Sequence, residues 1–253
     1  MLPLLHSHRS IRAFKPDPLP RDIVEAVVVA GQRASTSSNL QTYCVVAVTD
    51  AAKRAELAHL CGDQDQIRQA PVFFAWCADL SKLDRACALR GLPHAHENTE
   101  SFLMSAVDVA LVMQNAAVAA ESLGLGICYI GGLRNNPRDV IRLLNLPHLV
   151  FPICGMTLGW PAAEPLLRPR LPLDAVLHWE THDRSDEDAL LHEYDRAMAA
   201  TGIYDQRQVA VPGRPDEAEN YGWLEHSARR VSRPARADLE QVLHEQGFLR
   251  KSG

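Results

Sequence analysis

Two short segments of the chain carry arginines at spacings that suit a phosphate. Residues 8–12 hold two arginines and a serine within five positions, and residues 168–172 hold Arg168 and Arg170 between prolines. A guanidinium group grips phosphate oxygens in a fork, and proline fixes the offset between neighbouring side chains. Arginines also gather on solvated loops and connectors, and this reading explains each segment alone at least as well.

Two further segments could contact the ring of a planar ligand. Residues 34–41 are rich in hydroxyl and amide side chains, which hydrogen-bond a polar ring edge, although a turn segment is the favoured reading in isolation. Residues 129–137 place Gly131 and Gly132 at the end of a strand, where a ligand can approach the backbone closely. Asn136 is expected to cap a helix that begins at Pro137. A simple strand-to-helix turn would need the same glycines.

Motifs for chemistry carried by the protein itself are missing. The sequence has no Gly-x-Gly-x-x-Gly after a strand, no Gly-Lys-Ser/Thr phosphate loop and no Gly-x-Ser-x-Gly elbow, and its histidines are scattered. His94, His96 and Glu97 lie in a polar loop without a matching ligand cluster downstream, so no metal site is expected. The chemistry is therefore expected to reside in a bound cofactor.

One predicted helix needs cover on most sides. Residues 101–123 form a helical pattern that is apolar almost all round from Val107 to Ala120. The expected covers are the protein's own sheet and a second subunit. Asp108, Gln114 and Asn115 leave too short an apolar stretch for a membrane span.

The other elements alternate between helix and strand. A helix is expected from Pro20-Arg21-Asp22 to Gly31, and another from Glu187 to Ala200. Buried strands are predicted at Tyr43–Val48, Val72–Cys77, Ile127–Ile130 and Phe151–Met156. This order predicts an α/β or α+β sandwich with helices on both faces.

The chain changes character after Gly159. Prolines mark an extended crossing segment, residues 205–236 have little periodicity, and a last amphipathic helix is expected to end at Phe248. We therefore expect one domain, with a core at residues 1–165 and a C-terminal excursion at residues 166–253.

Composition and charge narrow the class of protein. A hydrophobic fraction of 47% and a charged fraction of 23% are ordinary for a globular protein. A net charge of -5 gives no sign of the basic face that nucleic-acid binding needs. The six cysteines lack Cys-x-x-Cys spacing and lie mostly in apolar runs, which predicts reduced thiols and a cytoplasmic location. Residues 1–5 are too short an apolar run for a signal peptide.

Taken in order, these motifs resemble the nitroreductase superfamily. The closest resemblance is to its NADPH-dependent, oxygen-insensitive major nitroreductases and related flavin reductases. The segments that carry it are residues 8–12, 120–126, 129–136, 158–161, 169–172 and 232–234. The resemblance implies an α+β three-layer sandwich, with a mostly antiparallel sheet flanked by helices. It also implies an intertwined homodimer with one FMN in each of two interface sites.

The resemblance assigns site residues by matching position. Its FMN-binding residues would be His8, Arg9, Ser10, Arg12, Thr36, Ser37, Ser38, Gln41, Gln64, Tyr129, Ile130, Gly131, Gly132, Arg168 and Arg170. The first four would hold the phosphate and the pyrimidine side of the ring. Tyr129 to Gly132 would run along the isoalloxazine, with a backbone N–H near Gly131 or Gly132 facing N5.

The substrate and NADPH side departs from the family pattern. The candidates there are Arg134, Arg207, Arg214 and Arg233, but residues 205–223 do not align with the family's NADPH loop, so both NADPH and NADH stay open. Arg168 stands where this branch commonly has lysine. Asn39 replaces a bulkier apolar residue within the segment at residues 34–41, a change expected to alter the acceptor pocket.

The activity implied by the resemblance is ping-pong hydride transfer from NADPH through FMN N5 to nitroaromatics, quinones or free flavins. No side chain need act as a nucleophile. A cation near flavin N1, either Arg12 or Arg168, would stabilise the reduced ring. The alternatives are flavin reduction for a partner monooxygenase, a flavin-binding protein without turnover, and a structural dimer without cofactor.

Overall fold

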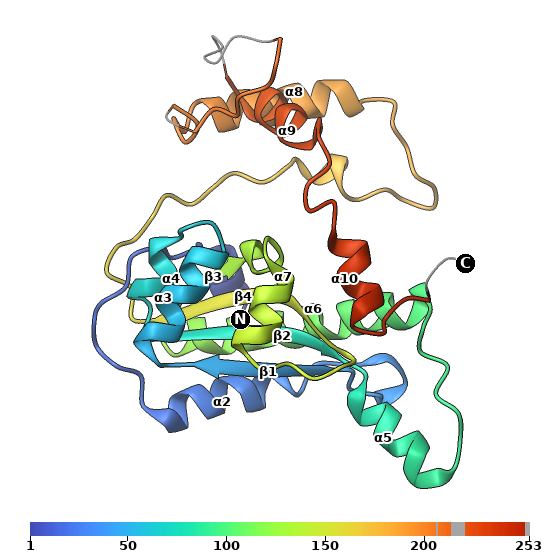
Figure 1. Cartoon of the computed structure of the whole chain (residues 1–253). Coiled ribbons are helices and arrows are strands. Elements are labelled where there is room, and N and C mark those ends of the chain that lie inside the picture. Colours follow the sequence, from blue (N-terminus) through green and yellow to red (C-terminus); the bar gives the residue numbers. More distant parts are fainter. Residues whose placement is uncertain (206, 214–220, 251–253) are drawn as a thin grey trace. The chain divides into compact units, whose positions relative to one another are not determined.

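A computed structural model describes residues 1–205, 207–213 and 221–250 of the chain (Figure 1). These residues divide into two compact units, Met1–Pro165 with Arg236–Gly253, and Leu166–Ala235. The first unit ends at the predicted boundary near residue 165, but the chain from Arg236 onward returns to it. That both units form a single domain stays a prediction.

The first unit is built on an antiparallel sheet. Its strands are β1 (Tyr43–Val48), β2 (Val72–Asp79), β3 (Gly126–Ile130) and β4 (Val150–Gly159). They lie in the order β1-β2-β4-β3, and each neighbouring pair is antiparallel. Every residue of β2 is buried, as expected for a central strand covered on both faces. The predicted α+β sheet is confirmed, and the main difference is that β4 is longer at both ends.

Helices cover both faces of this sheet. Successive side chains of β2 point to opposite faces, and since all of them are buried, each face needs a layer of helices. Phe74 and Trp76 pack in one cluster with α2 (Arg21–Gly31) and α6 (Thr99–Ser122). Phe73 and Ala75 pack in the opposite cluster, which α3 (Ala51–Leu60), α4 (Asp65–Gln69) and α7 (Pro137–Leu143) complete. The three-layer sandwich is therefore present in the first unit.

Helix α6 is the long apolar helix expected from the sequence. By length and composition it could cross a membrane, so the expectation that its polar residues leave too short a stretch is wrong. Its buried residues Val109, Val112 and Ala116 nevertheless pack in the core with α2 and the sheet. Its opposite face exposes Leu103, Val107 and Leu111, which are 55%, 49% and 45% accessible.

The remaining elements of the first unit are short. They are α1 (Leu2–His6), α5 (Ser81–Arg90), α10 (Leu239–Glu245) and 3-10 turns at Ser37–Asn39 and Gly131–Arg134. The chain after α10 is fixed by Phe248, whose ring meets those of Phe102 and Phe151 edge-on at 5.9 and 6.2 Å. Helix α10 ends at Glu245, earlier than the predicted Phe248.

The second unit holds a 3-10 turn at Leu173–Ala175 and the helices α8 (Glu187–Ala199) and α9 (Trp223–Val231). Helix α9 corrects the prediction of an irregular stretch at 205–236. Its one buried position is Arg229, which pairs with Glu225 at 2.6 Å and donates to the carbonyl of Val209 at 3.0 Å. The buried position of this helix is therefore held by a charged side chain.

Candidate functional site

The arginine-bearing segment at residues 8–12 is fixed against the start of β3. Ser10 forms a parallel bridge with Ile127, and the N–H of Ile11 donates to the carbonyl of Ile127 at 2.8 Å. A Cβ on Gly126 would lie 2.6 Å from Ile11, so only glycine lets the segment pack this closely. His8 Nδ1 lies 2.5 Å from Glu121 Oε1 at the end of α6. The segment is therefore held in a defined conformation.

The two arginines of this segment differ in what they contact. Arg9 pairs with the carboxylate of Glu164, and its Nε is buried with no hydrogen-bond partner among the described residues. A buried guanidinium N–H without an acceptor is costly, and an anion would satisfy it. Arg12 is exposed, and its Nη1 lies 3.4 Å from the carbonyl of Ser10. The donor set of this segment thus fits a phosphate.

The loop at residues 34–41, rich in hydroxyl and amide side chains and called the Ser-rich loop below, is organised by a buried acid. The sequence analysis noted this acid only as a polar break in the long helix. Asp108, 1% exposed, accepts hydrogen bonds from the N–H of Ser37 at 2.9 Å and from the N–H and hydroxyl of Thr42 at 3.1 and 2.8 Å. Ser38 and Gln41 have left-handed backbones between these anchors.

This loop presents polar groups to solvent. Asn39 also adopts positive φ, and the side chains of Ser37, Ser38, Asn39 and Gln41 are exposed, while Thr36 is half-buried. A buried carboxylate inside an apolar helix was the signal for this arrangement, because such a charge requires hydrogen-bond donors.

The glycine turn after β3 packs against the end of α3. A Cβ on Gly132 would lie 2.4 Å from the carbonyl oxygen of Cys61 and 2.7 Å from Gln64 Nε2. Gln64 Nε2 itself donates to the carbonyl of Cys61 at 2.9 Å. The structure therefore brings together Gln64 and Gly132, two residues that the sequence analysis assigned to the same site.

Asn136 anchors the same turn in a way that differs from the prediction. It stands at the start of α7 but makes no side-chain capping bond there. Its amide instead donates to the carbonyl of Leu60 at 2.7 Å, while Asn135 donates to Cys61 at 3.4 Å. The side chain predicted to cap α7 therefore links the glycine turn to α3 instead.

The strand residues before the glycines turn their side chains inward. The hydroxyl of Tyr129 donates to the carbonyl of Met113 at 3.2 Å and lies 3.0 Å from Gln114 Oε1, and burial raises its pKa above the ordinary value. Ile130 is 1% exposed in the cluster beneath α3. A ligand along this strand would therefore meet backbone rather than these side chains.

Arg236 holds the other side of the glycine turn and was not predicted. Its Nη2 donates to the carbonyl of Gly131 at 3.0 Å and its Nε to Asn135 Oδ1 at 3.1 Å. Arg134, predicted to face substrate, donates from Nη1 to the carbonyl of Ile153 on β4. Its role toward a substrate stays a prediction.

The remaining predicted cations belong to the second unit. Arg170 folds back on its own segment, donating to the carbonyl of Arg168 at 3.1 Å. Burial raises the pKa of Tyr204, and the charge of Arg168 opposes that shift. Arg207 and Arg233 are exposed, and Arg214 lies outside the described residues. Their assignment to FMN or NADPH stays a prediction.

Comparison with known proteins identifies the family to which the chain belongs. The pattern of the nitroreductase family matches residues 5–160, and that of the nitroreductase family C-terminal domain matches residues 168–251. The chain therefore belongs to the nitroreductase family, and it is an oxidoreductase.

Individual relatives match over nearly their whole length. The oxygen-insensitive NADPH nitroreductase of Salmonella typhimurium is 38% identical, covering 97% of this chain and 96% of its own. The FMN reductase (NADPH) of Bacillus subtilis is 35% identical over 96% and 95%. Among solved structures, the NADPH:FMN oxidoreductase from Vibrio harveyi complexed with NAD+ superposes with a TM-score of 0.85 at 32% identity, over 99% of each chain.

Proposed function

We propose that the protein is an FMN-dependent NAD(P)H oxidoreductase that reduces nitroaromatics, quinones or free flavins. The names of its relatives support the reaction class. Bound FMN would supply hydride acceptance and donation at N5, and one site serving both substrates in turn gives ping-pong kinetics. The observation that carries the proposal is the buried, unpartnered Nε of Arg9 within a segment fixed on β3.

The chain's own residues would bind and orient the flavin. Arg9 and Ser10 would hold the phosphate, and His8, paired with Glu121, would keep the segment in position. Arg12 would face the pyrimidine side, where a fixed positive charge stabilises the electron-rich reduced ring. Arg168 and Arg170 of the second unit are the further cations in this proposal.

The glycine turn would provide the flat wall of the site. The side chains of Tyr129 and Ile130 point into the protein, and Gly131 and Gly132 add none. A planar ring can approach such a backbone closely, with a backbone N–H near Gly131 or Gly132 facing N5. Gln64, which contacts the same turn, would add an amide contact.

The protein is further proposed to act as a homodimer. Leu103, Val107 and Leu111 form an exposed apolar stripe along α6, which a second copy of α6 would bury. Asp108 anchors the Ser-rich loop, and Glu121 anchors the segment at residues 8–12 that is proposed to bind the phosphate. These two acids lie thirteen residues apart on α6, or about 20 Å along its axis. We therefore assign Thr36, Ser37, Ser38 and Gln41 to the flavin bound mainly by the partner.

The dinucleotide would be NADPH, with NADH also accepted. Relatives are named for NADPH and for NAD(P)H, and a similar solved structure holds NAD+. Arg134, Arg207, Arg214 and Arg233 are the candidate contacts. A role in supplying reduced flavin to a monooxygenase is the second candidate, because two relatives are named FMN reductases. Reduced thiols throughout the described chain suit the proposed cytoplasmic location.

The test begins with the absorbance of the purified protein. We expect flavin bands equivalent to one FMN per chain, a dimer by light scattering, and NADPH oxidation with a nitroaromatic, a quinone and free FMN as separate acceptors. Arg9→Gln should lose most of the flavin, because glutamine cannot neutralise a phosphate. A colourless wild-type protein that does not take up added FMN would overturn the proposal.

A further inference from the structure

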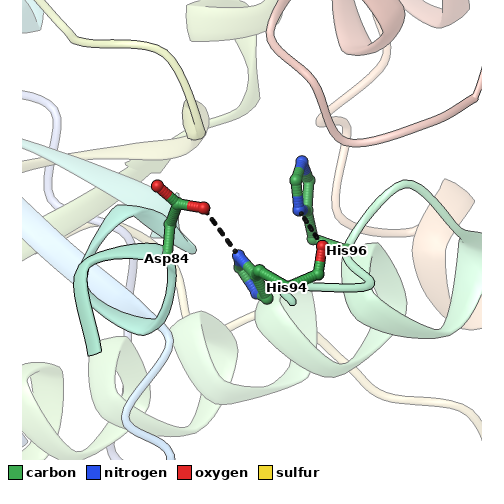
Figure 2. A group of neighbouring side chains, drawn as sticks. All are labelled: Asp84, His94 and His96. Atoms are coloured by element: carbon green, nitrogen blue, oxygen red, sulfur yellow. Dashed lines mark hydrogen bonds and ion pairs between the residues drawn. The ribbon is translucent and has the colours of Figure 1, made fainter. Parts of the chain in front are cut away.

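A cluster of potential metal ligands lies between α5 and α6, on residues that the proposed flavin site does not use. Asp84 belongs to the first turn of α5, and His94 and His96 lie on the loop that leads to α6 (Figure 2). One ligand atom from each of the three residues lies within 4.8 Å of the others. Two imidazoles and one carboxylate form a donor set typical of divalent transition metals.

The spacing of the first pair suits a shared cation. His94 Nδ1 lies 3.3 Å from Asp84 Oδ1, which is long for an N–H···O hydrogen bond. Two ligand atoms bound tetrahedrally to Zn²⁺ at about 2.1 Å stand about 3.4 Å apart. The observed distance therefore matches one edge of a zinc coordination shell without movement of either side chain.

His96 makes a backbone contact that is typical of metal-binding histidines. Its Nδ1 lies 2.9 Å from the carbonyl oxygen of His94, and Figure 2 shows this contact. A ring that donates from Nδ1 to a carbonyl carries its lone pair on Nε2, which is the arrangement that fixes the tautomer of many metal ligands. The centroids of the two imidazole rings lie 4.5 Å apart, and the rings are tilted by 41°. In Figure 2 the second nitrogen of His96 points away from Asp84, so the His96 ring would have to turn for all three residues to bind one ion.

We propose that Asp84, His94 and His96 form a zinc site with three protein ligands and water in the remaining position. The sequence analysis sought a further ligand downstream of His96, whereas the structure supplies one upstream, on α5. Glu97 takes no part, since its carboxylate lies 3.8 Å from Arg250. The ion would tie α5 to the loop that leads into α6.

The exposure of the site sets the kind of binding to expect. The side chain of His94 is 14% exposed and that of Asp84 is 54% exposed, so the ion stays in contact with water on one side. Such an open site keeps a free coordination position and exchanges its metal, unlike a closed structural site. Imidazole ligands favour Zn²⁺ over Mg²⁺, which prefers oxygen.

The test is equilibrium dialysis of the untagged, flavin-loaded, chelator-stripped protein against ZnCl2, with metal content measured by elemental analysis. We expect the wild-type protein to bind one more zinc ion per chain than the His94→Gln variant. His94→Gln, His96→Gln and Asp84→Asn should each weaken zinc binding tenfold or more, and MgCl2 should not displace the zinc.

The matched control is His59→Gln. His59 lies on α3, and its Nδ1 is 3.5 Å from Oδ1 of Asp63 in the turn after this helix, so the pair offers a histidine and a carboxylate without a second imidazole. Its loss should leave zinc binding unchanged within twofold. The proposal is overturned if wild-type protein binds no zinc, or if His94→Gln and His96→Gln bind as much as wild type with the same thermal midpoint.

Discussion

The carboxylate of Asp108 accepts hydrogen bonds from both the backbone N–H and the hydroxyl of Thr42, at 3.1 and 2.8 Å. Its other oxygen accepts from the N–H of Ser37 at 2.9 Å. Both acid and threonine are buried, and charge-assisted bonds offset the cost of removing a carboxylate from water. One residue of α6 thereby fixes both ends of the loop proposed to meet the partner's flavin.

Asp108→Asn should destabilise the protein although the side chain keeps its shape. Asparagine replaces one acceptor oxygen by an NH2 group that would face an N–H donor, so at least one buried hydrogen bond is lost. We expect a loss of about 2–3 kcal/mol in the free energy of unfolding, measured by urea denaturation at fixed protein concentration. Thr42→Val, which removes only the hydroxyl, should cost about 1 kcal/mol. Equal stability of wild type and Asp108→Asn would contradict this reading.

The two glycines of the turn after β3 should respond differently to alanine. At Gly132 the new Cβ would lie 2.4 Å from a backbone carbonyl, which cannot move like a flexible side chain. At Gly131 the nearest atom would be 3.7 Å away, an ordinary contact. Gly132→Ala should lose about 1–3 kcal/mol of stability, and Gly131→Ala should lose much less. Thermal unfolding without added flavin separates this packing effect from ligand binding.

The sequence predicts the sheet and the main helices well because their signals are local. The strand at residues 43–48 has the bounds that the pattern predicted, and the helix predicted from Glu187 to Ala200 ends one residue earlier, at Ala199. Contacts between a polar side chain and distant backbone leave no such pattern. Asp108 with Thr42, 66 positions apart, and Asn136 with Leu60, 76 positions apart, became visible only in the structure.

The candidate site divides in the same way. Residue types made the segment at 8–12, the Ser-rich loop and the glycine turn candidates, although a loop or turn explained each segment alone at least as well. The resemblance to the nitroreductase superfamily is what assigned the three segments to one predicted site. Arg236 was missed, since a single arginine in a polar stretch carries no signal until folding brings it to Gly131. Helix α9 was missed as well, and its one buried residue, Arg229, is charged.

Arg236→Ala should weaken flavin binding, given the proposed function, without removing any residue expected to touch FMN. Its two hydrogen bonds hold the carbonyl of Gly131 and the side chain of Asn135, and thus the backbone that would face the ring. We expect a rise of about fivefold to tenfold in the FMN dissociation constant, since bonds of a partly exposed arginine are modest. Flavin fluorescence titration measures it. Arg236→Lys, which keeps the charge but not the two-pronged contact, should recover little; full recovery would show that charge alone matters.

Ionisation of the Cys61 thiol should lower the free energy of unfolding at alkaline pH. Burial, with a smaller contribution from the nearby Cys154, raises the pKa of the Cys61 thiol to about 12. The same thiol ionises near pH 9 in the unfolded chain, so between these values the unfolded state binds fewer protons than the folded state. The free energy of unfolding therefore falls as pH rises, by up to about 1.4 kcal/mol per pH unit, and the contribution of this thiol is intact below pH 9.

The comparison that isolates this effect is wild type against Cys61→Ala, with urea denaturation at several values from pH 7 to pH 10.5. Alanine costs some packing at every pH, but it removes the ionisable group. The stability difference between the two proteins should therefore shrink steadily above pH 9. In the folded protein the thiol should also resist iodoacetamide at pH 8, because the thiolate is the reacting form and burial suppresses it. A constant difference between wild type and variant across this range would mean that Cys61 ionises equally easily in the folded and unfolded chain.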